Sequence, residues 1–371
     1  MSLIYNIIIF LLAFGTIQEV SRDQPISKVY FWGVVVVMIL TAGLGYGLSP
    51  DWVGYFDAFN IVGQLPNLVE VKLFGESYGM ENGYLIANRL LYTLGFDFGM
   101  VSLLLVSISL YLKGSTFRKY AGYPMLALFM YMVPNYFFEE HIHIRQGLAT
   151  AIMLYSVRFI IDRKFWKFSL CLVIAYQFHE SCIVFLLAYW IAKVRVSTPM
   201  IGILVGVAIV ANLTGLTSVI DAIMEVMPFG QDKFEAYESD IYKTGGIAIG
   251  DIVKIMTVIA IMVFNKRAAK DETYLVFRNL FIMGVLLYFF LGRGIFGIRL
   301  PGYYLVFIGL VVCRILYNMR DEGFVRNFVF YSFFSYTIAL FFWFQIKQGP
   351  KTNFDKYKTF FHPTAIYGLW R

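Results

Sequence analysis

Long runs of apolar residues dominate the chain, and short clusters of charged residues separate them. Clear runs cover residues 29–48, 200–213, 255–264 and 328–344. About 20 apolar residues in a helix cross the hydrocarbon core of a bilayer. Backbone groups at that depth have no water to bind, so the runs must be helical. The pattern predicts an all-α polytopic integral membrane protein, with residues 1–371 forming a single membrane domain.

The charged positions predict an orientation. Basic clusters between the apolar runs are expected on the cytoplasmic side. They contain Arg22, Lys28, Lys113, Arg118, Lys119, Arg158, Arg163, Lys164, Lys167, Lys193, Arg195, Lys266, Arg267, Lys270, Arg278, Arg314, Arg320 and Arg326. Acidic loops at about residues 49–83 and 221–246 are expected outside. The result is about twelve transmembrane helices with both termini outside, although the outer tail at about residues 347–371 carries four lysines.

Two stretches of the chain decide the number of crossings. We interpret residues 166–194 as two short helices that meet near His179 and Glu180, because one long helix would send the basic residues after it outward. We interpret residues 84–112 as an interfacial helix to about Phe96, followed by one crossing.

Composition supports the membrane assignment and excludes other classes. Hydrophobic residues make up 59% of the chain and charged residues 15%, and soluble proteins carry about 25% charged residues. The net charge of +7 does not indicate nucleic-acid binding, because the basic residues lie at the ends of apolar runs. The three cysteines, at positions 171, 182 and 313, lie in or beside apolar runs without metal-ligand spacing, and we expect them to pack in the interior.

The strongest candidate site is the connection at residues 139–146. Its candidate residues are Glu139, Glu140, His141, His143, Arg145 and Gln146. A helix there would place His141 and Arg145 on one face, and Glu139 and His143 on another. A carboxylate or imidazole suits a general base, and an arginine suits phosphate oxygens. The alternative is a solvated loop whose ions pair with one another. The spacing fixes no third metal ligand, so no metal is expected.

Two further segments carry candidate residues. His179 stands beside Glu180 and Ser181 at the expected break between short helices, where a packing role is the alternative. Arg293 and Arg299 lie in a stretch from Gly292 to Gly302 that contains four glycines and one proline. We expect this stretch to be an irregular loop that captures an anion, and the alternative is that the arginines reach lipid phosphates.

These motifs together resemble one family. Arg145-Gln146 opening a helix, the basic turn Arg163-Lys164 and Phe178-His179-x-Ser181 resemble the Wzy-like, EpsG-type polysaccharide polymerases. Asp51-x-x-x-Tyr55, Glu81-x-Gly83-Tyr84, and Arg299 followed by Tyr303 and Tyr304 fit the same family. The resemblance extends from about residue 50 to 310. The chain departs from it in Glu180 and in a second histidine before Arg145. The fold expected from the resemblance is that of GT-C-type membrane glycosyltransferases.

The resemblance also implies a function. Such enzymes join polyprenyl-pyrophosphate-linked oligosaccharide units, as donor and acceptor, on the outer face of the bacterial cytoplasmic membrane. They use no cofactor, and a chain-length regulator is a possible partner besides the lipid bilayer. The expected base is Glu139, Glu140, His141 or His179. The expected substrate-binding residues are Arg145, Gln146, Arg293, Arg299, His143, Asp51 and Tyr55. A flippase or transporter of the same lipid-linked sugar, or a glycan ligase, is the alternative.

Overall fold

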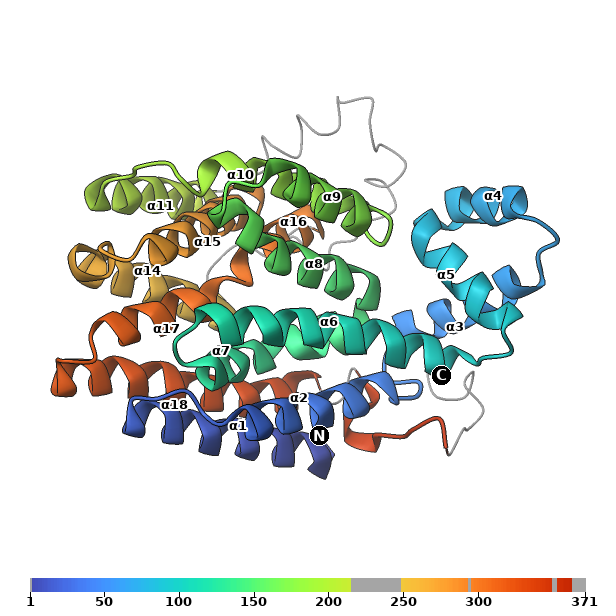
Figure 1. Cartoon of the computed structure of the whole chain (residues 1–371), viewed down its shortest axis with the longest axis horizontal. Helices are drawn as coiled ribbons and strands as arrows, with labels where there is room; N and C mark the ends of the chain where they lie inside the picture. Colours follow the sequence, from blue (N-terminus) through green and yellow to red (C-terminus); the bar gives the residue numbers. More distant parts are fainter. Residues whose placement is uncertain (1, 215–247, 293–294, 349–351, 362–371) are drawn as a thin grey trace. The chain divides into compact units, whose positions relative to one another are not determined.

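The computed structural model describes residues 2–214, 248–292, 295–348 and 352–361 (Figure 1). These residues are mainly helical, and no β-strand occurs among them. The described chain divides into two compact units. The first contains residues 1–183 and 324–371, and the second contains residues 184–323. The expected all-α class is confirmed.

The first unit contains most of the candidate residues. Its elements are α1 (Leu3–Arg22), α2 (Lys28–Gly43), α3 (Pro50–Gln64), α4 (Leu68–Tyr78), α5 (Asn82–Thr93), α6 (Phe98–Tyr120), α7 (Pro124–Tyr131), η1 (Met132–Ile142), α8 (Ile144–Ile161), α9 (Phe165–Tyr176), α18 (Gly323–Gln348) and η5 (Asn353–Lys356). The first residue of α18, Gly323, is counted with the second unit. The short helices α3, α4 and α5 gather at the end of this unit where α6 begins (Figure 1).

The second unit contains the later helices. They are α10 (Ala188–Ile191), α11 (Thr198–Leu213), α14 (Ile249–Ala268), α15 (Glu272–Leu291), α16 (Ile295–Leu305) and α17 (Ile308–Asn318). The 3₁₀ segment η2 (Glu180–Leu187) begins in the first unit and ends in the second. A buried network holds the start of α15, where Arg278 donates to Asn265 Oδ1 at 2.9 Å and to Asn279 Oδ1 at 2.8 Å.

Six described helices are long and apolar enough to cross a membrane: α1, α6, α8, α15, the stretch Arg299–Asn318 and α18. Four shorter apolar helices cover Lys28–Gly43, Phe165–Tyr176, Glu180–Ile191 and Thr198–Leu213. These helices support a polytopic membrane protein, but the expected number of twelve crossings is not confirmed.

The loops of the first unit gather at its two ends. At one end, Arg118 donates to the carbonyl of Ile26 at 3.2 Å, and Arg326 lies 3.3 Å from Asp23. At the other end, residues 352–361, named here the tail segment, lie along residues 44–48. There the Tyr46 N–H donates to the carbonyl of Lys358 at 3.0 Å. The N-terminus is at the same end, since the Ser2 N–H donates to the carbonyl of Phe354 at 2.9 Å.

Both predicted breaks are present. The chain ends α9 at Tyr176 and folds back, because the Cys182 thiol lies 3.9 Å from the carbonyl of Leu172. Ten residues of continuous helix would separate these positions by about 15 Å. A separate α5 precedes the long helix α6, and Ile86 and Leu90 of α5, with Leu94 directly after it, are exposed apolar side chains.

The expectation of an irregular loop at residues 292–302 is wrong for most of that stretch. Gly292 breaks the chain with a positive φ of 68°, but residues from Ile295 onward form α16. Pro301 lies inside that helix, which membrane helices tolerate when neighbouring groups bind the freed carbonyl. Residues 293–294, and with them Arg293, lie outside the part of the chain that the structure describes. The same holds for the predicted outer loop at residues 221–246.

Candidate functional site

Arg145 is the centre of the candidate site. It is the second residue of α8, directly after the break at His143 that ends η1. Its guanidinium lies over the Tyr55 ring of α3, 5.4 Å from the centroid, and 5.7 Å from the centroid of the Tyr84 ring of α5. Its Nη1 pairs with the carboxylate of Glu81, and only 15% of its side chain is exposed. The cation is therefore held between two aromatic rings and one carboxylate.

Local sequence explains how these three helices reach Arg145. Ser49 caps α3 by accepting the Trp52 N–H at 3.2 Å, and Pro50 suits the first helical turn. Gly79 ends α4 in the left-handed conformation with a φ of 63°. The chain then turns at residues 80–81 and begins α5, which places Glu81 and Tyr84 beside the start of α8.

The turn at residues 177–181 lies against the start of α5. The second carboxylate oxygen of Glu81 accepts the Glu180 N–H at 3.1 Å, and the Tyr84 N–H donates to the carbonyl of Gln177 at 3.1 Å. Gly83 permits this contact, since a Cβ there would lie 2.4 Å from the Cβ of Gln177. Burial raises the pKa of the Tyr84 phenol above its ordinary value. Four separate motifs thus meet around Arg145.

His179 lies within this turn and is paired with Ser181. Its Nδ1 is 2.7 Å from the Ser181 hydroxyl, and the residue is only 8% exposed. The hydroxyl can donate to this nitrogen or accept from it, according to the tautomer of the imidazole. An imidazole held in this way has the chemistry of a general base.

Asp51 and His143 form the more exposed part of the site. His143 Nε2 lies 3.5 Å from Asp51 Oδ2, and their side chains are 32% and 42% exposed. Asp51 is one helical turn before Tyr55 on α3, and His143 is two residues before Arg145. The pair therefore forms a polar rim beside Arg145. Gln146, the next residue of α8, is nearly buried.

Glu139 and Glu140 bind a buried lysine, which the charge pattern assigns instead to a cytoplasmic basic cluster. Lys113, in α6, is fully buried, and its Nζ lies 2.7 Å from Glu139 and 2.6 Å from Glu140. It also donates to the Tyr131 hydroxyl at 2.8 Å and to the carbonyl of Gly147 at 3.1 Å. Its assignment to the cytoplasmic basic cluster is wrong. The signal was present in the sequence, since a lysine inside an apolar run needs an ionic partner.

His141 faces a different environment from Arg145. Its ring is buried among Tyr5, Tyr136, Phe137 and Phe354, at centroid distances between 5.0 and 6.0 Å. Neither ring nitrogen has a hydrogen-bond partner. The expectation that His141 and Arg145 share one helical face is wrong, because the chain leaves helical geometry at His143 between them. The pairing of Glu139 and His143 on a second face fails for the same reason.

Arg299 lies in the second unit, in α16, where it is half-buried.

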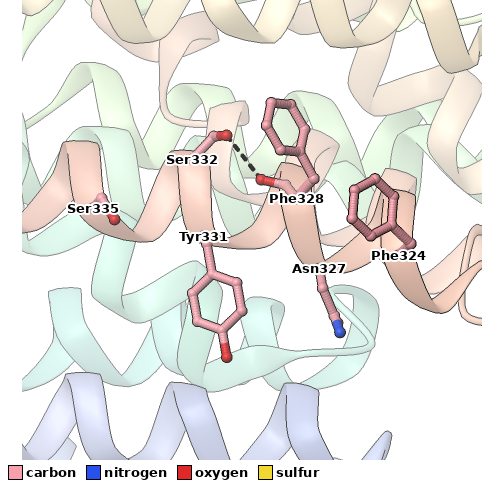
Figure 2. Close-up of a pocket in the computed structure, with 6 residues that line it drawn as sticks. All are labelled: Phe324, Asn327, Phe328, Tyr331, Ser332 and Ser335. Atoms are coloured by element: carbon pink, nitrogen blue, oxygen red, sulfur yellow. Dashed lines mark hydrogen bonds between the residues drawn. The ribbon is translucent and has the colours of Figure 1, made fainter.

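A shallow hollow on α18 is lined by Phe324, Asn327, Phe328, Tyr331, Ser332 and Ser335 (Figure 2). It contains no residue expected from the sequence to act in catalysis or substrate binding. Among the described residues, no group of three or more His, Cys, Asp or Glu side chains is placed to hold a metal ion.

Comparison with known proteins places the chain in a family. No curated protein and no solved structure is detectably similar to it. The model of the EpsG family matches residues 28–359, which is nearly the whole chain. The match includes every motif that meets around Arg145, and EpsG-type proteins are Wzy-like polysaccharide polymerases. The chain belongs to the EpsG family.

Proposed function

We propose that this protein polymerises polyprenyl-pyrophosphate-linked oligosaccharide repeat units into a cell-surface polysaccharide, at the outer face of the bacterial cytoplasmic membrane. Family membership supports a polymerase activity. The observation that carries the location of the chemistry is the convergence on Arg145 of Tyr55, Glu81 and Tyr84. The turn that carries His179 is attached to the same place through Glu81.

The reaction joins two lipid-linked glycans. A hydroxyl of the acceptor sugar attacks the anomeric carbon of the donor, a new C–O bond forms, and the bond to pyrophosphate breaks. The hydroxyl proton passes to a base, and the polyprenyl pyrophosphate leaves with the bonding electrons. The enzyme must therefore stabilise an anionic leaving group and accept one proton.

Arg145 is the group that we assign to the pyrophosphate. Its planar guanidinium presents paired N–H donors to phosphate oxygens, and its charge is permanent. Low exposure strengthens this interaction, because little water competes for the donors. Arg293 and Arg299 remain proposed anion-binding residues on the strength of the family resemblance alone. Gln146 and the exposed pair of Asp51 and His143 are assigned to sugar hydroxyls, together with Tyr55.

His179 is the residue that we assign as the base. Glu140 and His141 are almost entirely buried, and Glu139 shares Lys113 and Tyr131 with Glu140. These contacts suit a role in positioning α8 more than in proton transfer. His179 has the Ser181 contact and the connection through Glu81 to Arg145.

The test uses purified protein in liposomes with a polyprenyl-pyrophosphate-linked repeat unit and no nucleotide sugar. We expect a ladder of multimers and the release of polyprenyl pyrophosphate. His179→Gln should slow ladder formation by about 10²-fold or more, since a positioned base contributes about 10²–10⁴-fold. The matched change His143→Gln, on the exposed rim, should slow it less. Intact substrate that moves between leaflets would contradict polymerisation and indicate a flippase.

A further inference from the structure

Glu81 connects two parts of the candidate site through its two carboxylate oxygens. Oε2 pairs with Nη1 of Arg145, and Oε1 accepts the backbone N–H of Glu180 at 3.1 Å. Its side chain is 13% exposed, so both contacts are shielded from water. The same guanidinium nitrogen also lies 3.4 Å from the carbonyl of Gly79. One side chain therefore joins the start of α8 to the turn that carries His179 and Ser181.

This arrangement conflicts with anion binding. In the structure, the carboxylate of Glu81 occupies Nη1 of Arg145, and Asp51 adds another negative charge on the rim beside it. A pyrophosphate that approaches this donor would meet a like charge, and close like charges repel strongly. An anion can use this donor only after the Glu81 carboxylate has moved away.

We propose that Glu81 is an internal counter-ion that the pyrophosphate of the substrate displaces from Arg145. This inference rests on the proposed function for the identity of the anion. The ion pair competes with the anion for Arg145, so only the fraction of molecules in which Glu81 has left Nη1 offers that donor to the substrate. The apparent affinity for the anion is lower than the intrinsic affinity by that fraction.

Displacement also gives Glu81 a positioning role. The carboxylate that moves is bonded to the Glu180 N–H, one residue from His179. The Tyr84 N–H continues to hold the carbonyl of Gln177, so the turn stays attached to α5 while its residues 179–181 adjust. Anion binding at Arg145 is thereby coupled to the position of the His179–Ser181 pair.

The direct test measures binding of inorganic pyrophosphate to the full chain in detergent, by calorimetry, with Glu81→Gln. The amide keeps the shape and the acceptor for the Glu180 N–H but carries no charge. We expect the dissociation constant to fall about tenfold, because the competing charge is gone. Glu76→Gln is the matched control. It removes the same charge from an exposed ion pair with Lys72 and should leave the dissociation constant unchanged.

A second variant distinguishes loss of the negative charge of Glu81 from a general loosening of its contacts. Glu81→Asp keeps the charge and should bind pyrophosphate no more tightly than the original protein. Equal tightening in both Glu81 variants would contradict displacement of a charge. Unchanged or weaker binding in Glu81→Gln, or no binding by any form, would also overturn the inference. Thermal unfolding of each variant checks that it is folded.

The polymerase assay distinguishes failure of this inference from failure of the proposed function. In that assay, Glu81→Gln should lower both KM and kcat, because the substrate binds more readily but no longer moves the His179 turn. Ladder formation without tighter binding in Glu81→Gln would overturn the inference alone. Tighter binding without a ladder from any form would support the counter-ion and contradict the polymerase.

Discussion

At the scale of single residues, the interior of the first unit contains an ammonium group between two carboxylates. Lys113 has no exposed side-chain surface and lies within 2.7 Å of both Glu139 and Glu140. Moving such ions out of water costs several kcal/mol each, so the site is stable only when all partners are present. Because Lys113 also binds the carbonyl of Gly147, this network fixes the first turns of α8, where Arg145 begins the candidate site.

Lys113→Met should therefore destabilise the protein strongly. The change leaves two buried carboxylates without their cation, and such losses cost about 3–5 kcal/mol. Thermal unfolding of the purified protein in detergent measures the effect. Lys72→Met is the control, because the pair of Lys72 and Glu76 is 64% and 60% exposed and contributes about 0–1 kcal/mol. Equal melting temperatures for the two variants would contradict a buried network.

Single residues also show where sequence reasoning succeeded and failed. Short sequence patterns identify the motifs around Asp51, Glu81, Arg145 and His179, and the structure brings these motifs together. Proximity in the sequence groups Lys113 with Arg118. Five residues of helix rotate a side chain by about 140°, so the two point in different directions. The apolar run around Lys113 indicates that it needs an ionic partner, and the tertiary fold identifies that partner as Glu139 and Glu140.

At the scale of elements, the site depends on short helices outside the long spans. The start of α5 contacts the turn after α9 at Gly83, with no room for a side chain. The segment η1 turns the chain at Val133, before Pro134, and then continues helically to Ile142. That continuation is why residues 139–142 are not the solvated loop that their polar composition indicates. The helical break at His143 was not predictable from residue types.

Gly83→Ala tests the contact between α5 and the turn. Its Cβ would lie 2.7 Å from the backbone oxygen of Gln177, so the turn must shift. A displacement of about 1 Å at a reacting group costs about 10²-fold in rate. We expect ladder formation to fall by that order, with a loss of about 1–3 kcal/mol in stability.

Gly54→Ala is the control for this change. Gly54 lies in α3 of the same unit, and a Cβ there meets no atom within 4 Å. The helix should gain up to about 1 kcal/mol from the substitution, and the rate should not change. A Gly83→Ala variant as active as the Gly54→Ala variant would show that the turn does not need its observed position.

At the scale of the whole molecule, the first unit is closed by contacts between the two ends of the sequence. Arg326 of α18 donates to the carbonyl of Val20 at 3.4 Å, and Gln345 donates to Asn6 at 2.8 Å, so α18 runs antiparallel to α1. The tail segment then lies along residues 44–48, and Phe354 packs beside Tyr5 and His141. Hydropathy predicts the helices but not these pairings.

Phe354→Ala tests whether the tail segment stabilises the unit. The ring is fully buried, and removing a buried phenylalanine costs about 3–5 kcal/mol. The melting temperature in detergent should fall accordingly. Phe361→Ala, at a residue that is 74% exposed in the same segment, should leave it unchanged. An unchanged melting temperature in Phe354→Ala would contradict a structural role for the tail segment.

The central claim is that polymerisation takes place around Arg145, and one comparison of two variants tests it most directly. Arg145 and Arg158 both lie in α8 over tyrosine rings, about 20 Å apart along the helix. The measurement is ladder formation in liposomes by Arg145→Lys and Arg158→Lys. Lysine keeps the charge but loses the planar fork, so we expect Arg145→Lys to slow polymerisation by about 10²-fold and Arg158→Lys to have little effect. A full ladder from Arg145→Lys at the original rate would contradict the account.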